Sequence, residues 1–265
     1  TRKNARNGFW ILTRFLKMLT RTDLEQFTSL LGFTIWQVER DYIQHLLLLF
    51  LAKRLDRGLV FKGGTALQKV FGLNRFSIDL DFTQEREISR DIFEAIKKDF
   101  RNFGFEANFQ EAKRKESRQI KFRVQGPLYQ GVERTLTVVR IDISAREKVL
   151  LEPETRDIFP RYPDIQPYIM RTMNMKEIMA EKVRAICTRT KARDVFDVRF
   201  LLQKMIPIDK TLVNEKLKIY HLKYSRAMFL EKIARTKSIW QQELSQLVSL
   251  IPDYNAVITQ IKEKM

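Results

Sequence analysis

Two carboxylates one residue apart are the residues of this chain best suited to chemistry. Asp79 and Asp81 stand in the run Arg75-Phe-Ser-Ile-Asp-Leu-Asp-Phe82. Alternate residues of a β-strand point to the same face, so we expect Ser77 to share a polar face with both carboxylates. Like charges held this close repel each other unless a cation neutralises them. Mg²⁺ suits this pair, because one or two carboxylates plus substrate phosphates usually hold it.

A glycine pair upstream supplies a second element of a site. Residues 59–61 are apolar and predict a short buried strand, which leads into Gly63-Gly64. Two glycines allow a tight turn with positive φ and a close approach of another group to the backbone. We expect Thr65 to cap a short helix over about residues 66–71. Backbone N–H groups at such a turn and helix start favour a phosphate.

A third carboxylate follows on a later strand. Apolar and polar residues alternate from Val139 to Ser144, which places Asp142 on the polar face of an otherwise apolar strand. Two-metal transfer of a phosphoryl or nucleotidyl group generally uses such a third carboxylate. The alternative is that Asp142 is an edge-strand charge that favours solubility.

A basic segment in the second half offers a phosphate ligand. Residues 175–187 carry an apolar helical stripe, with Lys182 at its margin. A lysine there buries its stem while its ammonium reaches into a cleft. Arg193 and Asp197 are spaced i,i+4 and could instead form a helix surface pair, and Asp194 could be an N-cap.

These motifs resemble a known enzyme family. Gly64-Thr65, separated by residues 66–78 from Asp79-Leu-Asp81, resembles the signature of the nucleotidyltransferase superfamily that includes DNA polymerase β. Thr65 replaces the serine frequent there and keeps the hydroxyl. The segments 61–67 and 75–82 are more closely similar to the AbiEii/AbiGii family, which are nucleotidyltransferase toxins of bacterial and archaeal toxin–antitoxin systems. The resemblance covers much of the chain from about residue 38 to 202.

The resemblance implies a set of roles. Asp79, Asp81 and Asp142 would be catalytic and bind Mg²⁺, and an NTP would be the substrate. The implied nucleotide-binding residues are Gly63, Gly64, Thr65, Ser77, Lys182 and Asp194, with Arg193 and Asp197 helping to shape the site. A separate antitoxin protein is the implied partner. Lys62 and Arg75 flank the first motif and could also contact phosphate.

Composition and charge narrow the partner. The net charge is +17, from 49 Lys and Arg against 32 Asp and Glu, which favours a polyanion such as nucleic acid. With the resemblance, this charge predicts an RNA acceptor, with the 3′ end of tRNA as the expected one. The longest apolar run, residues 46–52, is too short to cross a membrane.

Cysteine and histidine usage excludes other classes. A single cysteine, Cys187, excludes an internal disulfide framework and most zinc sites, and suits a cytoplasmic protein. Cys187 lies in an apolar helical pattern and is expected in the core, and His45, inside an apolar run, is expected in the core or at its boundary. They share no motif with His221, so a Ser-His-Asp or Cys-His mechanism is unsupported.

The order of elements predicts an α+β fold: a polymerase-β-like sheet domain with a C-terminal helical domain. We expect helices over residues 9–20, 22–31, 35–57 and 89–103, and later strands over 105–114, 117–126 and 133–144. Four prolines within residues 152–173 indicate a linker. The predicted domains are therefore 1–151, with N-terminal helices and the transferase sheet, and 174–265, which is helical.

Three functions stay open on the sequence alone. The first is Mg²⁺-dependent transfer of NMP to RNA by a toxin. The second keeps the chemistry but uses a protein hydroxyl or a small molecule as acceptor, against which the charge weighs. The third is a non-catalytic nucleic-acid-binding protein on the same fold, against which the intact carboxylates argue.

Overall fold

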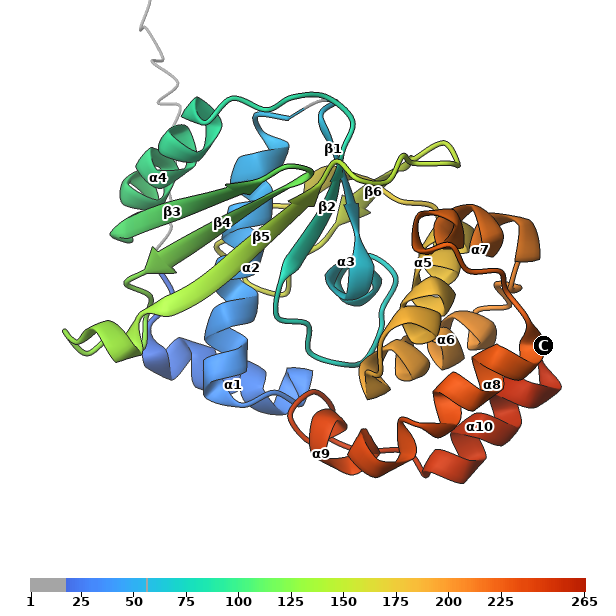
Figure 1. Cartoon of the computed structure of the whole chain (residues 1–265). Helices are drawn as coiled ribbons and strands as arrows, with labels where there is room; N and C mark the ends of the chain where they lie inside the picture. The colour runs from blue at the N-terminus through green and yellow to red at the C-terminus, as the bar shows by residue number, and fades with distance from the viewer. Residues whose placement is uncertain (1–17, 56) are drawn as a thin grey trace, which may run out of the picture.

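A single mixed sheet organises the first two thirds of the chain (Figure 1). The computed structural model describes residues 18–55 and 57–265. The strands are β1 (Leu59–Lys62), β2 (Leu80–Gln84), β3 (Ala107–Arg114), β4 (Ser117–Val124), β5 (Thr137–Ser144), β6 (Glu154–Ile158) and β7 (Tyr168–Thr172). Their order in the sheet is β3-β4-β5-β2-β1-β7-β6. Strand β2 is parallel to β5 and antiparallel to β1, and this pairing places the segments of the predicted site side by side.

Helices precede, interrupt and follow the strands along the chain. They are α1 (Arg21–Leu31), α2 (Ile35–Ala52), α3 (Gly63–Lys69), α4 (Asp91–Phe103), α5 (Met175–Thr188), α6 (Ala192–Gln203), α7 (Lys210–Leu217), α8 (Arg226–Ala234), α9 (Trp240–Leu244) and α10 (Tyr254–Glu263). The mixture confirms the predicted α+β class. Within the described residues, no helix is long and apolar enough to cross a membrane.

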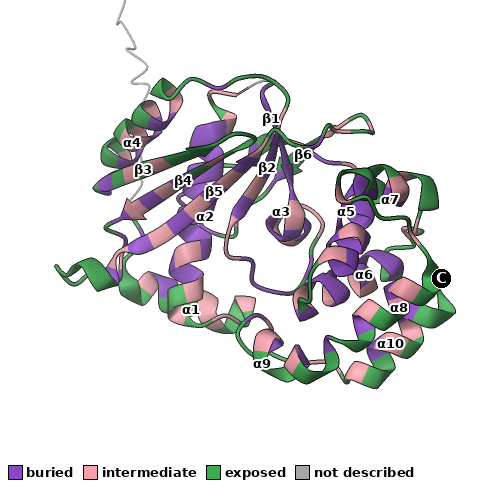
Figure 2. Cartoon of the chain, in the orientation of Figure 1, coloured by how far each residue is buried: buried purple, intermediate pink, exposed green. Residues whose placement is uncertain are grey.

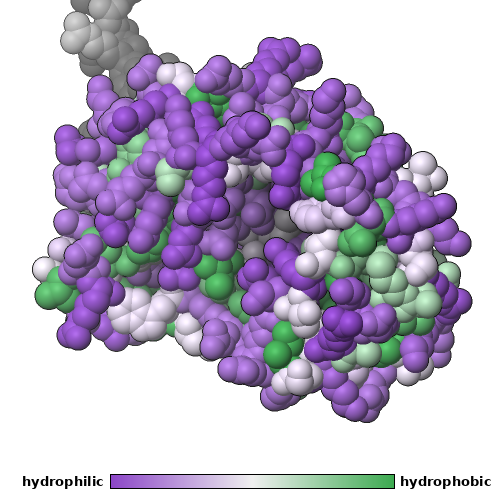
Figure 3. Space-filling model, viewed as in Figure 1, coloured by the Kyte–Doolittle hydropathy of each residue, from purple (hydrophilic) through white to green (hydrophobic). Residues whose placement is uncertain are grey.

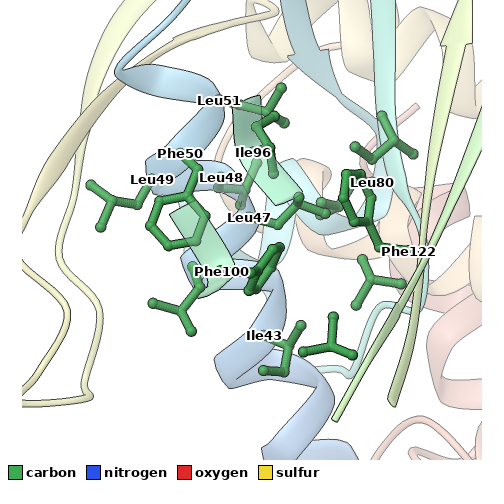
Figure 4. Close-up of a cluster of buried hydrophobic side chains, with 14 of the residues drawn as sticks. Ile43, Leu47, Leu48, Leu49, Phe50, Leu51, Leu80, Ile96, Phe100 and Phe122 are labelled. Atoms are coloured by element: carbon green, nitrogen blue, oxygen red, sulfur yellow. The ribbon is translucent and has the colours of Figure 1, made fainter. Parts of the chain in front are cut away.

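The main hydrophobic core lies between the sheet and α2. A capping box of Thr34 and Gln37 starts this helix, and its leucine-rich part is buried. Figure 4 shows α2 side chains such as Leu47 among Leu80 and Phe122 of the sheet and residues of α4. Every second residue of β5 is buried, as Figure 2 shows by colour. The opposite face of β3, β4 and β5 therefore carries the polar side chains, including Asp142.

A second core holds the C-terminal helices together. It joins residues from α5 to α10 and includes Val60 of β1 and Leu67 of α3. The helices thus pack against the β1–α3 side of the sheet (Figure 1). Cys187 belongs to this core, and burial raises the pKa of its thiol to about 11. His45 is buried too, on α2, where burial lowers its pKa to about 3.

The segment predicted as a linker contributes two strands instead. Residues 152–173 contain β6 and β7, which extend the sheet at its β1 edge through the parallel pair β1–β7. The four prolines misled the prediction because all of them lie outside the two strands, where they do not interrupt a ladder. The division into domains 1–151 and 174–265 stays a prediction.

Two local expectations at the motif also differ from the structure. The helix after β1 begins at Gly63, so Thr65 lies inside its first turn and does not cap it. The strand expected from Arg75 begins only at Leu80, because the backbone before it is bonded to side chains. Gln44 Nε2 donates to the carbonyl oxygens of Ser77 and Ile78, at 3.0 and 2.8 Å. The expected helix over residues 9–20 falls largely outside the described residues.

Candidate active site

Asp81 and Asp142 are direct neighbours across two parallel strands. The register of β2 and β5 pairs Asp81 with Asp142, flanked by the buried pairs of Leu80 with Ile141 and Phe82 with Ile143. Both carboxylates line a cavity of about 310 Å³ between the sheet and α5. Figure 3 shows the hollow between the sheet and the C-terminal helices, with mostly hydrophilic residues around it. The alternation in the sequence therefore placed Asp142 correctly beside the motif.

Asp79 lies at the margin of this group. It precedes β2 at a bend, and its side chain is 32% exposed and is not part of the cavity lining. Arg140 Nη1 donates to Asp79 Oδ1 at 3.5 Å. Burial raises the pKa of Asp79, and the charge of Asp142 raises it further. Asp79 is therefore close enough to Asp142 to be influenced by its charge, but its side chain contacts Arg140.

The raised pKa of Asp81 shows that its ionised form is destabilised beside the other two carboxylates. Burial raises the pKa of Asp81 to about 6, although Lys182 and Lys62 oppose the rise. The charges of Asp142 and Asp79 add to it. A carboxylate that is buried beside like charges loses its proton only with difficulty. A cation among the three would remove that cost.

The donor chemistry of the group fits Mg²⁺. Asp81 and Asp142 offer hard oxygen ligands side by side, and Mg²⁺ is usually bound through one or two carboxylates plus substrate phosphates. Asp142 Oδ1 accepts from Gln119 Nε2 at 2.7 Å, a bond that orients it. Among residues 18–55 and 57–265, no three acidic, histidine or cysteine side chains are already close enough together to hold a metal ion. Asp79 would therefore join the other two carboxylates only after a rotation, and water and substrate phosphates would supply the remaining oxygen ligands.

Side chains of Asp81 and Arg75 approach the backbone at Gly63 and Gly64 so closely that these positions favour glycine. Gly63 has φ +75°, and a Cβ there would lie 2.3 Å from Asp81 Oδ2. A Cβ on Gly64 would lie 2.2 Å from Arg75 Nη2. A side chain at Gly63 would therefore displace Asp81, one at Gly64 would displace Arg75, and Gly63 additionally has a left-handed backbone. Gly63 lines the cavity, while Gly64 is buried behind it.

Thr65 and Ser77 are hydrogen-bonded to each other, and Thr65 also holds the backbone of the segment that carries Asp79. The Thr65 hydroxyl contacts Ser77 Oγ at 2.7 Å and donates to the carbonyl oxygen of Asp79. Ser77 N–H donates to Gln68 Oε1 at 2.9 Å. Both hydroxyl residues are buried and lie outside the cavity lining. Their positions fit a role in holding Asp79 rather than direct contact with a nucleotide.

Lys182 is held at the cavity wall by two carboxylates of α6. Its Nζ lies 2.8 Å from Asp197 Oδ2 and 3.1 Å from Asp194 Oδ1. Burial alone would lower the pKa of Lys182, but these two carboxylates raise it. Lys182 therefore stays charged at a position that lines the cavity. This is the position that the apolar stripe of residues 175–187 predicts for Lys182.

The two carboxylates of α6 are completely buried and each has a second cation. Arg75 donates to both oxygens of Asp197, at 2.6 and 2.7 Å, and Arg189 donates to Asp194. Burial would raise the pKa of each carboxyl, but Arg75 and Lys182 lower that of Asp197, and Lys182 and Arg189 lower that of Asp194. Asp194 thus positions Lys182 and does not reach the cavity. Arg193 contacts Glu243 at 3.9 Å instead.

A second buried ion network comes from the C-terminal helices. Lys62 Nζ lies 2.9 Å from Glu181 Oε1, and Lys216 of α7 lies 3.4 Å from the same oxygen. Burial would raise the pKa of Glu181, but Lys62 and Lys216 lower it to about 2. Glu181 and Lys62 both line the cavity. Residues beyond 205, for which the sequence offers no motif, thus support the site through Lys216.

Sequence reasoning missed most of the basic lining. The cavity also contacts Arg114, Arg118, Arg146, Arg184 and Arg189. The alternation of β4 gives no signal for Arg118, because Arg118 pairs with Ile143 and shares the parity of the buried residues of that strand. Arg184 of α5 and Arg189 at its C-cap follow Lys182 along the chain, but only the packing of α5 on the sheet shows that they line the cavity.

Comparisons with known proteins agree with this geometry. The family model "Nucleotidyl transferase AbiEii toxin, Type IV TA system" matches residues 46–261. None of the curated proteins matches the chain. Among solved structures, MenT4, a nucleotidyltransferase toxin from Mycobacterium tuberculosis H37Rv, is similar with a TM-score of 0.68 and 22% identity, covering 93% of this chain and 88% of that one.

A second solved structure is similar over nearly the same extent. JHP933 from Helicobacter pylori gives a TM-score of 0.61 with 20% identity, covering 88% of this chain and 91% of that one. These likenesses support the fold, and the family match covers most of the chain. The chain therefore belongs to the AbiEii family of nucleotidyltransferase toxins of type IV toxin–antitoxin systems and is itself a nucleotidyltransferase.

Proposed function

We propose that this toxin transfers NMP from an NTP to an RNA acceptor in a Mg²⁺-dependent reaction, with the 3′ end of tRNA as the expected acceptor. The observation that carries the proposal is the Asp81–Asp142 pair, which faces Lys182 across one cavity. Seven lysines and arginines line that cavity against four acidic residues. An excess of cations beside paired carboxylates suits a triphosphate that arrives with its metal.

The residues divide between donor and acceptor. An acceptor hydroxyl attacks the α-phosphorus, the bond to the β-phosphate breaks, and pyrophosphate leaves. Asp142, on the polar face of β5, would receive the proton of the attacking hydroxyl. Lys182 and Lys62 would balance the charge of the leaving pyrophosphate, and Gly63 would let the phosphates approach the backbone. Mg²⁺ bound by Asp81, Asp142 and Asp79 would stabilise the attacking and leaving oxygens.

The choice of RNA rests on charge. A net charge of +17 favours a polyanionic acceptor over a neutral small molecule. The intact carboxylates weigh against a non-catalytic nucleic-acid-binding protein, because their mutual repulsion is a cost that binding alone would not require. The family implies an antitoxin partner.

The proposal is tested by following the label from each NTP. The protein is incubated with Mg²⁺, total RNA and one α-labelled NTP at a time, and RNA, protein and small molecules are then separated. Label in RNA, concentrated in tRNA and absent with Asp81→Asn, is the expected result. Label in protein or in a small molecule, with none in RNA, would overturn the choice of acceptor. No incorporation into any fraction would overturn the proposed activity.

A further inference from the structure

Three arginines from separate elements interact with Asp79 by contact or by charge, and none of them lines the cavity. Arg40 comes from α2, Arg140 from β5 and Arg193 from α6. Arg140 is in contact with Asp79 Oδ1 at 3.5 Å. The charges of Arg140 and Arg193 act on Asp79, and the charge of Asp79 acts on Arg40. We call Arg40, Arg140 and Arg193 the arginine cradle.

The arginine cradle has guanidinium donors that its neighbours do not use. Arg40 and Arg140 repel each other, the charges of Asp79 and Glu39 offset part of the charge of Arg40, and Arg193 lies 3.9 Å from Glu243. The neighbouring Glu39 accepts from Leu128 N–H and from the Thr137 hydroxyl. Arg40 Nε is buried and has no hydrogen-bond partner among the described residues. Guanidinium groups with spare donors are suited to bidentate contact with a phosphate.

Metal binding would free a further donor. If Asp79 turned to a cation, Arg140 would lose its carboxylate and the guanidinium groups would face added positive charge. Like charges this close oppose each other unless an anion joins them. The triphosphate site is not that anion's place, because Lys62, Lys182 and Gly63 line the cavity while none of the three cradle arginines does. The cradle is thus a second place for an anion beside the reacting centre.

The cradle opens onto the polar face of the sheet. The register places Lys121 of β4 directly beside Arg140, and Arg123 lies two residues further along the same strand. The side chains of Arg140 and Arg193 are 43% and 33% exposed, so a ligand can reach them. In Figure 1 this face of β3, β4 and β5 turns toward the viewer, with α2 and α4 behind it. A row of cations thus leads from the cradle across the open sheet.

We propose that the arginine cradle binds the phosphodiester nearest the 3′ end of the nucleic-acid acceptor. This inference rests on the proposed function, because it assumes that the acceptor is a nucleic acid. A phosphate held there would place the terminal nucleotide between Arg140 and Asp142, which lie two residues apart on one strand and share its face. The acceptor hydroxyl would then approach the carboxylates from the open sheet side, opposite the triphosphate.

The test combines a change in the protein with a change in the acceptor. The acceptor is a short RNA whose 3′-terminal linkage is either a natural phosphodiester or an uncharged methylphosphonate. Arg40→Gln and Arg140→Gln are expected to raise KM for the natural RNA on the order of tenfold or more, with KM for NTP little changed. The methylphosphonate should cost the wild type a similar factor and cost each variant little more, because the two changes remove one contact.

Controls separate this contact from a general loss of charge or fold. Arg101→Gln removes an exposed arginine of α4, on the covered side of the sheet, and should leave every parameter unchanged. Arg140→Lys keeps the charge and should recover part of the affinity. Direct binding of both RNAs without NTP or metal gives a readout independent of chemistry.

The outcomes are distinct. Additive losses from the variant and the methylphosphonate, or a rise in KM for NTP instead of RNA, would overturn the cradle's role. If the wild type transfers to no RNA, the proposed function fails. In that case, binding of the short RNA that still depends on its terminal phosphate and on Arg140 would leave the phosphate site standing.

Discussion

Asp81 and Asp142 lie side by side on the parallel strands β2 and β5, and among residues 18–55 and 57–265 no third acid is already in place to complete a metal site with them. Without a cation, the ionised pair destabilises the folded state, since burial and neighbouring carboxylates raise the pKa of Asp81 to about 6. The carboxylate that a bound metal needs therefore lowers the stability of the metal-free protein.

The first prediction follows from that opposition. Asp81→Asn should lower transfer by about 10³-fold or more, because a metal ligand contributes several kcal/mol. Without metal, the same variant should unfold at a temperature equal to or above that of the wild type, since it removes a carboxylate whose ionisation is disfavoured at this position. Activity assays and thermal denaturation in EDTA measure the two effects. Undiminished transfer, or a clearly lower melting temperature, would contradict the assignment.

The second prediction concerns pH and metal. The folded pKa of Asp81, about 6, lies above its ordinary value of 3.8, so the folded state holds this proton more tightly. Without metal, the stability contributed by this group is greatest at low pH and falls as pH rises through about 4 to 6. Mg²⁺ competes with that proton and should therefore raise the melting temperature more at pH 7.5 than at pH 5. A shift that is equal at both pH values, or is kept in Asp81→Asn, would count against metal binding here.

Gly63 offers a third prediction with a matched control. Alanine at Gly63 would have a left-handed backbone and a Cβ 2.3 Å from Asp81 Oδ2, whereas Gly131 has φ +79° and nothing within 4 Å of its Cβ position. The backbone cost, about 1–2 kcal/mol, should be common to both substitutions. Gly63→Ala should additionally displace Asp81 and lose most of the transfer activity. Equal activities of Gly63→Ala and Gly131→Ala would show that the close approach has no functional weight.

The fourth prediction separates the nucleotide site from the general basic surface. Lys182→Ala should weaken NTP binding more than RNA binding, because Lys182 lies at one ordered position in the cavity wall. It should also cost roughly 3 kcal/mol of unfolding free energy, since it removes a cation from two buried carboxylates. Lys176→Ala, on the exposed surface of the same helix, is the control. Separate titrations with NTP and RNA test it, and equal losses in both would remove Lys182 from the nucleotide site.

Local periodicity was enough to predict the parts of the site that lie on regular elements. The alternation in β5 placed Asp142, and the helical stripe of α5 placed Lys182. Thr65 was misassigned because its hydroxyl finds the carbonyl of Asp79, a partner that only the folded chain brings near. The contact of Lys216 with Glu181 joins residues 35 positions apart, and no local pattern encodes it. The arginine cradle likewise comes from three distant elements, so its members are indistinguishable in the sequence from the many exposed arginines.

The fifth prediction concerns salt. Binding of RNA through its phosphates releases counterions, so the logarithm of the affinity should fall with the logarithm of salt concentration, by about 0.7 per phosphate contacted for single strands. In the proposed site the NTP would be bound by close, directed contacts in a partly buried cavity, where screening is weaker. Raising salt should therefore raise KM for RNA well before it changes KM for NTP. Arg140→Gln should make the RNA slope shallower by about the same 0.7, while Arg101→Gln should leave it unchanged. An RNA affinity that does not respond to salt, or efficient transfer to a small neutral acceptor without RNA, would favour an acceptor that is not a nucleic acid.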